Sequence, residues 1–500
     1  MRMIPIILAV VSLILSLFLS AYSIRSLLFS YTARRDVREK RQSSYDLCRS
    51  SSASALEDSH PDRDIILNNN IKNSNTSYLQ IDRLNIKRAS STRINEIDSP
   101  FISILIATYN ERLVIDRLMR SCAALTYNRE KFEIIIVDDS EDDTFDILKN
   151  WKQEIPNLKV IHRNERTGWK GGALNIALKN ININSSYVLI VDADNVLMND
   201  TLERFVSYFS KYNSDGNYID VIQGYPISRV FNNSNASLDT TNTNWIARGI
   251  EFRLAQRNII EFLAKDRIKL PVQITGSLFM IRSDLIKQFG FSNDLCEDWE
   301  LTLNVYFHTN IMSSYGNETY YRNCRNNNNN KNRKKVIFDP LLVSYCEAST
   351  KLGPYLRQRM RVSEGHTRAF RKNLIKILTS KIAFTDKIEF FFIGGQYAKF
   401  ILLFALIIID CLILISSGTE FIINNNIMNL TLIIQIANLL VIIGTSLLAI
   451  PLCSYIRNYD VKDSLYLLLL NLCTMPAFVL GSLRGFFRKE GIFYKTERNS

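Results

Sequence analysis

The chain has 500 residues, of which 47% are hydrophobic, and it carries a formal net charge of +12. Its length predicts more than one structural unit, and its hydrophobic content excludes a globally disordered protein. Long uncharged apolar runs lie beside very polar stretches. This contrast excludes a simple soluble enzyme and also a wholly buried membrane bundle.

Basic residues gather beside the apolar runs, and their placement indicates a membrane surface as the partner. One cluster lies at 34–41, and others lie at 368–372 and 484–489. Such clusters are typical of the cytoplasmic face of a membrane. We expect no nucleic-acid partner, because the sequence has no zinc-finger, RRM-like or basic-zipper pattern. The eight cysteines form no C-x-x-C pair, which indicates reduced thiols instead of a disulfide framework or a zinc site.

The first apolar run, Met3 to Ile24, is uncharged and long enough to span a bilayer. An uncleaved anchor fits it better than a signal peptide, whose apolar region is shorter and precedes a small-residue cleavage site. More basic residues follow this run than precede it, so the segment after it should be cytoplasmic. We expect a transmembrane anchor at 1–30 and a polar, Ser- and Asn-rich linker at 31–98.

Residues 99–367 have the pattern of an α/β catalytic domain. Three short apolar runs, ending near Asn110, Ser140 and Asn195, finish in polar or acidic residues. Such runs are typical of buried parallel strands. Helical patterns at about 112–125, 143–152 and 171–180 separate them, which predicts a βαβ sheet with its ligands beyond the carboxyl ends of the strands. An Asn-rich stretch at 309–335 is expected to form a loop insert.

The C-terminal part of the chain returns to apolar sequence. Residues 368–389 mix apolar and basic residues and predict a helical segment in the membrane interface. Residues 390–487 predict a transmembrane region with three candidate spans, at 390–416, 421–456 and 464–483, and residues 488–500 form a basic, cytoplasmic-type tail. We expect a multi-pass integral protein of the cell membrane with a cytoplasmic catalytic domain.

This topology contains a conflict. Three spans after a cytoplasmic domain would place the basic tail outside, which the positive-inside rule disfavours. Either the last segment, which Pro476 interrupts, is re-entrant or interfacial, or the number of spans differs.

Two pairs of acids follow predicted strands. Asp138 and Asp139 could accept hydrogen bonds from a base or ribose, or cap the next helix. Asp192 and Asp194 form a D-x-D pair, which can share a divalent cation with phosphate oxygens. Acids are also common in turns, but the place of this pair directly after an apolar strand favours the metal site.

Other candidate site residues lie outside these pairs. Lys170 precedes two glycines at a predicted helix start, which suits a phosphate or nucleotide, although a plain loop is the alternative. In the Glu297–Asp298 pair, an acid facing a substrate hydroxyl could act as a general base, or cap a helix. Arginines near Gln358 could stabilise a departing diphosphate or contact lipid headgroups.

Taken in order, these residues resemble the membrane-bound members of glycosyltransferase family 2, the group of cellulose, hyaluronan, mannan and glucosylceramide synthases. The resemblance runs from about Phe101 to the C-terminus and includes ATYNE at 107–111, KGGALN at 170–175 and the final GIFYKTERN. It implies an α/β GT-A (Rossmann-like) glycosyltransferase domain inserted between transmembrane helices. It also implies an inverting hexosyl transfer from a nucleotide sugar, with UDP as the usual nucleotide of the family.

The resemblance further implies a role for each candidate residue. Asp298 would be the catalytic base, and Asp192 and Asp194 would bind Mg²⁺ or Mn²⁺. The donor would be bound by Asp138, Asp139, Lys170, Asp192 and Glu111. The diphosphate and acceptor would be bound by Gln358, Arg359, Arg361, Thr275, Gly276 and Glu297.

The sequence departs from the family pattern at two places. Val362 stands where the family has a tryptophan that helps to hold the acceptor sugar, and Cys296 replaces a peripheral threonine. The C-terminal spans beside an interfacial helix favour a growing β-linked polysaccharide as the product, whereas Val362 favours a single sugar on a membrane lipid, such as a glycolipid or a polyprenyl phosphate. We expect the polysaccharide.

Two hypotheses belong to other classes of protein. A non-catalytic membrane scaffold is disfavoured because Asp192, Asp194 and Asp298 are all retained. A transporter would explain Lys399 and Asp410 inside an apolar run, but the absence of internal repeats disfavours it. The expected partners are therefore a nucleotide-sugar donor, a glycan or lipid acceptor, and membrane lipid.

Overall fold

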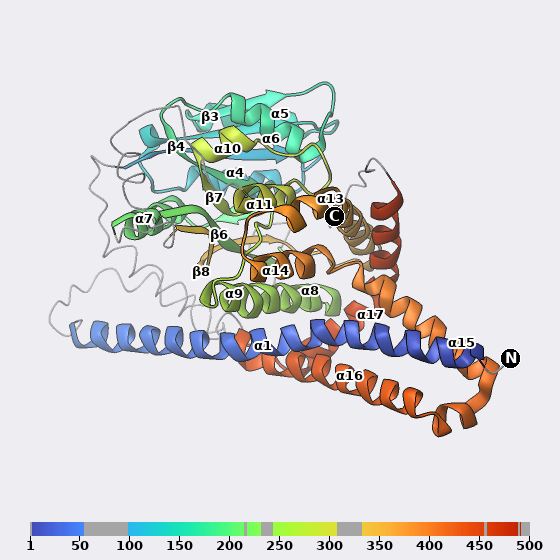
Figure 1. Cartoon of the computed structure of the whole chain (residues 1–500). Coiled ribbons are helices and arrows are strands. Elements are labelled where there is room, and N and C mark those ends of the chain that lie inside the picture. Colours follow the sequence, from blue (N-terminus) through green and yellow to red (C-terminus); the bar gives the residue numbers. More distant parts are fainter. Residues whose placement is uncertain are drawn as a thin grey trace.

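The computed structural model describes residues 3–54, 99–214, 218–231, 244–307, 333–454, 458–488 and 491. Most of the predicted linker, of the Asn-rich insert and of the basic tail lies outside these residues. The described parts form an α/β domain that rests on a layer of helices, and two long helices run beneath that layer (Figure 1).

A mixed eight-stranded sheet, in the order β3-β2-β1-β4-β7-β6-β8-β5, forms the centre of the described part. The first four strands of this order, β3, β2, β1 and β4, are parallel to one another, as the βαβ pattern predicts. The strands are β1 (Phe101–Thr108), β2 (Phe132–Asp138), β3 (Leu158–His162), β4 (Ser185–Asp192), β5 (Asn195–Leu197), β6 (Tyr218–Arg229), β7 (Phe279–Arg282) and β8 (Arg333–Glu347).

The other half of the sheet departs from a simple βαβ repeat. Strand β7 is antiparallel to both β4 and β6, while β8 is parallel to β6. These strands carry no long apolar run: β7 has four residues, and β6 contains the buried polar side chains of Asp220 and Gln223. The start of β8 at Arg333 also shortens the insert predicted at 309–335.

Helices cover both faces of the sheet. Alternate strand residues point to opposite faces, so Ile104 and Ile134 belong to one core cluster while Leu105 and Ile135 belong to the other. The helices of the domain are α4 (Ile115–Ala123), α5 (Thr144–Glu154), α6 (Trp169–Lys179), α7 (Thr201–Ser214), α10 (Ser283–Phe289) and α11 (Glu297–Phe307).

A nearly continuous helical stretch joins this domain to the long helices. It consists of α8 (Trp245–Ala255), the π-helical segment η3 (Gln256–Phe262) and α9 (Leu263–Arg267). The same buried cluster that covers one sheet face includes Phe29 and Ala33 near the N-terminus and Cys453 near the C-terminus. The hydrophobic core of the domain is therefore continuous with the membrane-type helices.

Six further helices complete the described structure: α1 (Met3–Ser54), α13 (Leu352–Thr379), α14 (Phe384–Gly394), α15 (Lys399–Asn424), α16 (Asn426–Cys453) and α17 (Val461–Phe487). By length and composition, four helical stretches of the described residues could cross a membrane, namely Ile4–Arg35, Lys399–Ser416, Asn426–Cys453 and Val461–Phe487. The predicted anchor and the three C-terminal candidate spans each correspond to one of these stretches.

Three expected boundaries differ in the structure. Helix α1 continues to Ser54, through the first part of the predicted linker. The boundary expected at 367–368 falls inside α13, because Arg368 is fully buried and its Nε lies 3.2 Å from Asp294 Oδ1 of the catalytic domain. The expected span at 390–416 is divided, since α14 ends at Gly394 and α15 begins at Lys399.

Helix α17 lies along the catalytic domain. Near its start, Asp463 accepts a 2.7 Å hydrogen bond from Arg248 Nε of α8. Near its end, the Arg371 guanidinium of α13 donates to the carbonyl of Phe486. Between these points Gly481 permits close packing on α13, because a Cβ there would lie 1.9 Å from Ser363 Oγ. Both ends of the helix are thus attached to helices that pack on the α/β domain.

Candidate active site

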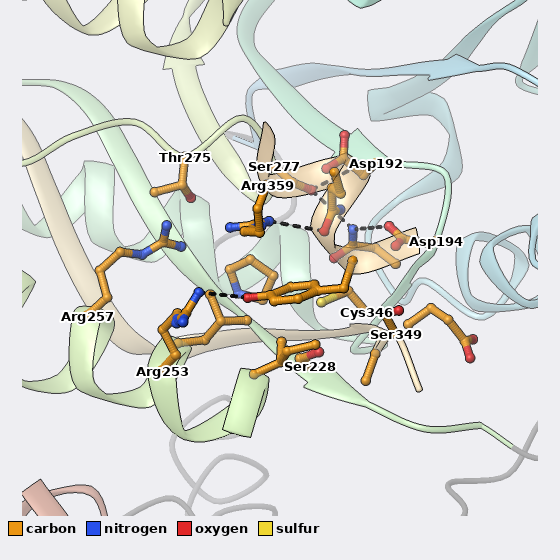
Figure 2. Close-up of a pocket in the computed structure, with 18 residues that line it drawn as sticks. Asp192, Asp194, Ser228, Arg253, Arg257, Thr275, Ser277, Cys346, Ser349 and Arg359 are labelled. Carbon is orange, nitrogen blue, oxygen red and sulfur yellow. Dashed lines mark hydrogen bonds between the residues drawn. The ribbon is translucent and has the colours of Figure 1, made fainter. Parts of the chain in front are cut away.

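A cavity of about 190 Å³ opens beyond the carboxyl end of β4. The D-x-D acids line it on one side, and a loop before β7 contributes Thr275 and Ser277 (Figure 2). Helix α13 contributes Gln358 and Arg359. The structure therefore brings together three of the sequence regions singled out above, in the place where a doubly wound sheet binds its ligands.

Lys170 connects the separate acidic motifs. It is the second residue of α6, and its Nζ lies 2.6 Å from Asp192 Oδ1 and 3.2 Å from Glu297 Oε1. The same ammonium donates a 2.7 Å hydrogen bond to the carbonyl of Gly276. Burial alone would lower the pKa of Lys170, but Asp192 and Glu297 outweigh that effect and raise it. The lysine therefore stays cationic among the carboxylates, beside the place where a phosphate would bind.

Two glycines after Lys170 allow α6 to approach its neighbours. A Cβ on Gly171 would lie 1.8 Å from the carbonyl oxygen of Ser292, and one on Gly172 would lie 2.1 Å from that of Thr167. Larger residues could not occupy either position without a shift of the backbone. Close packing of α6 against the backbone of its neighbours thus requires the two glycines of the K-G-G motif. This packing holds Lys170 at the start of the helix.

Asp298 lies in the first turn of α11 and has the properties of a base that works near neutral pH. Burial, and next the charge of Glu297, raise the pKa of its carboxyl to about 7. One of its oxygens accepts a 2.8 Å hydrogen bond from the backbone N–H of Trp299. A carboxyl group with a pKa close to the ambient pH is suited to accept and release a proton.

The loop 275–277 is fixed against the D-x-D strand. Gln223 accepts a 2.9 Å hydrogen bond from the backbone N–H of Thr275 and donates one of 2.9 Å to the carbonyl of Ser277. Ser277 Oγ in turn accepts from the backbone N–H of Asp192. Gly276 has a φ of +81°, and a Cβ there would lie 3.2 Å from Asp298 Oδ2, so this position favours glycine in both conformation and space.

Thr275 offers a free hydroxyl to the site. Its Oγ1 is buried and has no hydrogen-bond partner among the residues that the structure describes. A buried unpaired hydroxyl costs free energy unless a ligand or water satisfies it. The position of Thr275 on the cavity wall makes a bound substrate the natural partner.

At the same carboxyl end of the parallel strands, beyond β1, the pair at 138–139 organises the loop after β2. Asp138 is fully buried and accepts hydrogen bonds from Thr108 Oγ1 at 2.7 Å and Ser140 Oγ at 2.6 Å. Asp139 pairs with the guanidinium of Arg163. The expected contact of both acids with the nucleoside stays a prediction, and the structure shows that each also has a structural partner.

The remaining expected residues lie around this centre. Gln358 and Arg359 line the cavity, whereas Arg361 does not, and burial lowers the pKa of Arg361 to about 10. Glu111 lies in the turn between β1 and α4, where its carbonyl accepts from the backbone N–H of Val114. The direct roles expected of Arg361 and Glu111 stay predictions.

Cys296 and Val362, the two residues that depart from the family pattern, lie next to each other. Cys296 Sγ lies 3.6 Å from the backbone carbonyl of Val362, and a Cβ on Gly365 of the same helix would lie 2.9 Å from that sulfur. The pair forms part of the packing between α11 and α13.

Sequence reasoning missed several residues of the cavity wall. Arg253 and Arg257 line it from the helical stretch beneath the sheet, and Tyr355 lines it from α13. Outside the cavity wall, the guanidinium of Arg166, a residue noted only as part of the lysine motif, lies 3.5 Å from the centre of the Tyr109 ring. The spacing of four residues between Arg253 and Arg257 was the available signal, since it places both on one helix face.

The D-x-D pair is suited to hold a divalent cation together with a substrate. Among the described residues no group of three or more His, Cys, Asp or Glu side chains could hold a metal ion alone. Asp192 and Asp194 nevertheless both line the cavity. Mg²⁺ is commonly held by one or two carboxylates with substrate phosphates and water, so the residues present fit such an ion.

Comparison with known proteins agrees with this arrangement. Residues 103–287 match the model of Glycosyl transferase family 2. This segment of the chain is therefore similar to members of that family. The match covers β1 to β7 and includes Lys170, Asp192 and the loop 275–277. With the mixed sheet described above, it confirms the predicted GT-A fold and the family that the motifs suggested.

Related family 2 enzymes act on different acceptors. The chain is 28% identical to a poly(ribitol-phosphate) beta-glucosyltransferase of Bacillus spizizenii over 228 residues, or 44% of this chain and 32% of that protein. It is 38% identical to a beta-monoglucosyldiacylglycerol synthase of Trichormus variabilis over 114 residues, or 22% of this chain and 24% of that protein. The chain thus spans about a third or less of the length of these relatives.

One solved structure was matched over most of its length. The mannosyltransferase PcManGT from Pyrobaculum calidifontis, in complex with GDP-Man and Mn²⁺, superposes with a TM-score of 0.49 at 17% identity, over 82% of this chain and 95% of that chain.

Proposed function

We propose that this protein is an inverting membrane glycosyltransferase that transfers a hexosyl group from a nucleotide sugar, with a UDP-sugar as the first candidate. The observation that carries the proposal is the convergence of Lys170, Asp192 and Glu297 within ion-pair distance, next to Asp298. Residues more than 100 positions apart in the chain meet there, at the ligand-binding edge of a family 2 domain.

The chemistry follows from the charges of the site. The donor diphosphate binds beside Asp192 and Asp194, where a bound divalent cation would offset its charge. Lys170, whose ammonium lies 2.6 Å from Asp192, supplies positive charge on the protein side. Asp298 takes the proton of the attacking acceptor group as the new bond to the anomeric carbon forms, and the nucleoside diphosphate leaves with the electron pair. A single displacement converts an α-linked donor into a β-linked product.

We propose a membrane lipid as the acceptor that receives a single sugar. Tyr355 is the one aromatic residue among the described residues that line the cavity, so the described wall offers no series of rings on which a growing glycan could stack. Val362 stands in place of the family's tryptophan, and a relative makes beta-monoglucosyldiacylglycerol. A polysaccharide product, the expectation from the sequence, is the second candidate, and it is favoured by the relative that acts on poly(ribitol-phosphate).

We also propose that α1, α15 and α16 cross the membrane and that α17 lies at its interface. Ala9 of α1 contacts Ile413 of α15 and Met428 of α16 at the far end of these helices. At the near end Arg25 pairs with Glu261 and Glu389 beneath the catalytic domain. This arrangement puts the catalytic domain and the basic tail on one side, in agreement with the positive-inside rule.

Transfer assays with isolated membranes test the proposed function. Membranes that contain the wild-type protein are incubated with labelled UDP- and GDP-sugars and Mn²⁺ or Mg²⁺, and the products are separated into organic and high-mass fractions. We expect Asp298-dependent label in the organic fraction. Label in the high-mass fraction would support the polysaccharide, and no label from any donor would contradict the proposal.

A further inference from the structure

Three arginines face one end of the cavity. Arg253 and Arg257 project from adjacent turns of the helical stretch beneath the sheet, and Arg359 projects from α13 (Figure 2). Other enclosed arginines of this chain have acidic partners: Arg163 pairs with Asp139, and Arg229 pairs with Glu251.

Within the described residues, none of these three guanidiniums lies within ion-pair distance of a carboxylate. The Nε atoms of Arg257 and Arg359 are buried and have no hydrogen-bond partner there. Arg253 is held by neutral groups, since it donates to the Tyr355 hydroxyl at 2.9 Å and to the side-chain oxygen of Asn471. The fold therefore positions three cations and leaves their charge uncompensated.

The enclosure of these arginines and their closeness to one another act on the pKa of two of them. Burial lowers the pKa of both Arg253 and Arg257, and the charge of Arg359 lowers them further. Enclosed cations that repel one another are costly unless an anion binds between them. Guanidinium groups match phosphate in geometry, because they can donate two parallel hydrogen bonds.

The neighbours of the three arginines indicate where that anion comes from. The D-x-D acids line the same cavity, and the donor diphosphate and its cation would bind beside them. The arginine end also has apolar neighbours, Ile250 and Leu254, on a helix that packs against α17. An anion bound there would lie next to the donor, on the side that faces the membrane-type helices.

We propose that Arg253, Arg257 and Arg359 form an anion subsite that binds a phosphate monoester carried by the acceptor. This inference rests on the proposed function and names the chemical class of its acceptor. The phosphate could come from a membrane lipid or from a water-soluble polyol phosphate, and the subsite recognises the chemistry that the two share.

Binding measurements on the full-length protein in nanodiscs test the subsite. The probes are dodecyl phosphate, glycerol 3-phosphate, the uncharged 1-O-dodecylglycerol, and UDP with Mn²⁺. We expect the wild-type protein to bind dodecyl phosphate about tenfold or more tightly than dodecylglycerol, as charge-assisted hydrogen bonds provide. Comparable binding of glycerol 3-phosphate would identify a soluble source of the phosphate, whereas a preference for dodecyl phosphate would identify a lipid.

Variants separate the subsite from the donor site. Arg257→Gln should weaken dodecyl phosphate about tenfold or more and leave UDP–Mn²⁺ binding unchanged. Arg257→Lys should restore part of the affinity, which loss of folding would not allow. Arg267→Gln, which removes the same charge from the end of the same helical stretch and does not line the cavity, is the matched control and should bind every probe as the wild type does.

Two results would overturn the inference. Equal binding of dodecyl phosphate and dodecylglycerol by the wild type would show that no phosphate is recognised. Weakened UDP–Mn²⁺ binding in Arg257→Gln, with dodecyl phosphate unaffected, would assign the arginines to the donor diphosphate. Failure of the proposed function is distinguishable from both, because the wild type would then not bind UDP–Mn²⁺ and would show no Asp298-dependent transfer.

Discussion

Replacement of Glu297 by glutamine should move the pH profile of sugar transfer to lower pH. Glu297 is, after burial, the largest cause of the raised pKa of Asp298, which lies at about 7. A base is active when it is deprotonated, so the wild-type rate should rise with pH through this value. Roughly one in eleven Asp298 groups is ionised at pH 6 and roughly ten in eleven at pH 8, so the rate should increase about tenfold between them.

The glutamine variant removes the repelling charge and keeps the size of the side chain. The pKa of Asp298 should therefore fall toward that of an ordinary carboxyl, and the rate should change less between pH 6 and pH 8 than in the wild type. Lys170→Met should have the opposite effect on the midpoint, because Lys170 lowers the pKa of Asp298. The two variants change the charge of the same site in opposite directions.

The assay measures the initial rate of transfer at saturating donor over a range of pH. Asp298→Asn is the control, which should lose roughly 10² to 10⁴ in rate and should have no midpoint near neutral pH. A midpoint that stays in place in Glu297→Gln, or that moves to higher pH, would refute the assignment of Asp298 as the base.

Three further predictions test other parts of the account. Gly276→Ala should reduce sugar transfer strongly, because this glycine has a φ of +81° and faces Asp298. The control Gly444→Ala, whose new Cβ meets no atom within 4 Å, should retain activity. Similar losses of activity in the two variants would contradict a specific role of the loop 275–277. Arg248→Gln should lower the stability of the protein by about 3–5 kcal/mol, because it leaves the buried carboxylate of Asp463 without its arginine partner. The control Arg120→Gln, at an exposed ion pair, should lower the stability by about 1 kcal/mol or less. Thermal unfolding in detergent compares the two variants, and equal melting temperatures would contradict the attachment of α17 to α8. In a cysteine-free background, a cysteine at Asn426 should react with an impermeant thiol reagent added outside the cell and one at Arg488 should not; the reverse result would exclude the proposed topology.

The sequence predicted three of the four parallel strands, β1, β2 and β4, and missed β3. Strands β1, β2 and β4 contain mostly apolar, buried residues, and β2 and β4 end in the acids Asp138 and Asp192 at the carboxyl edge of the sheet. Lys170 could be recognised because the two glycines after it are required by close backbone contacts. Local information was sufficient wherever the feature depended on neighbouring residues in the chain.

Features that depend on distant residues were not predictable in the same way. The pairing of β6, β7 and β8 joins segments more than 50 positions apart, and none of them has a long apolar run. Arg253 and Arg257 have the spacing of any basic helix face, so only the tertiary structure reveals that this face meets the cavity. The expected domain boundary at 367–368 lies inside helix α13 in the structure. The sequence could not show this, because the burial of Arg368 depends on Asp294, which is far away in the sequence.

The most direct test of the central claim is the transfer of label from UDP-sugars by membranes that contain either the wild-type protein or Asp298→Asn. We predict a labelled product that extracts into organic solvent with the wild type and is reduced roughly 10² to 10⁴-fold in the variant. Equal labelling by the two proteins would contradict the assignment of this cavity as a glycosyltransferase active site.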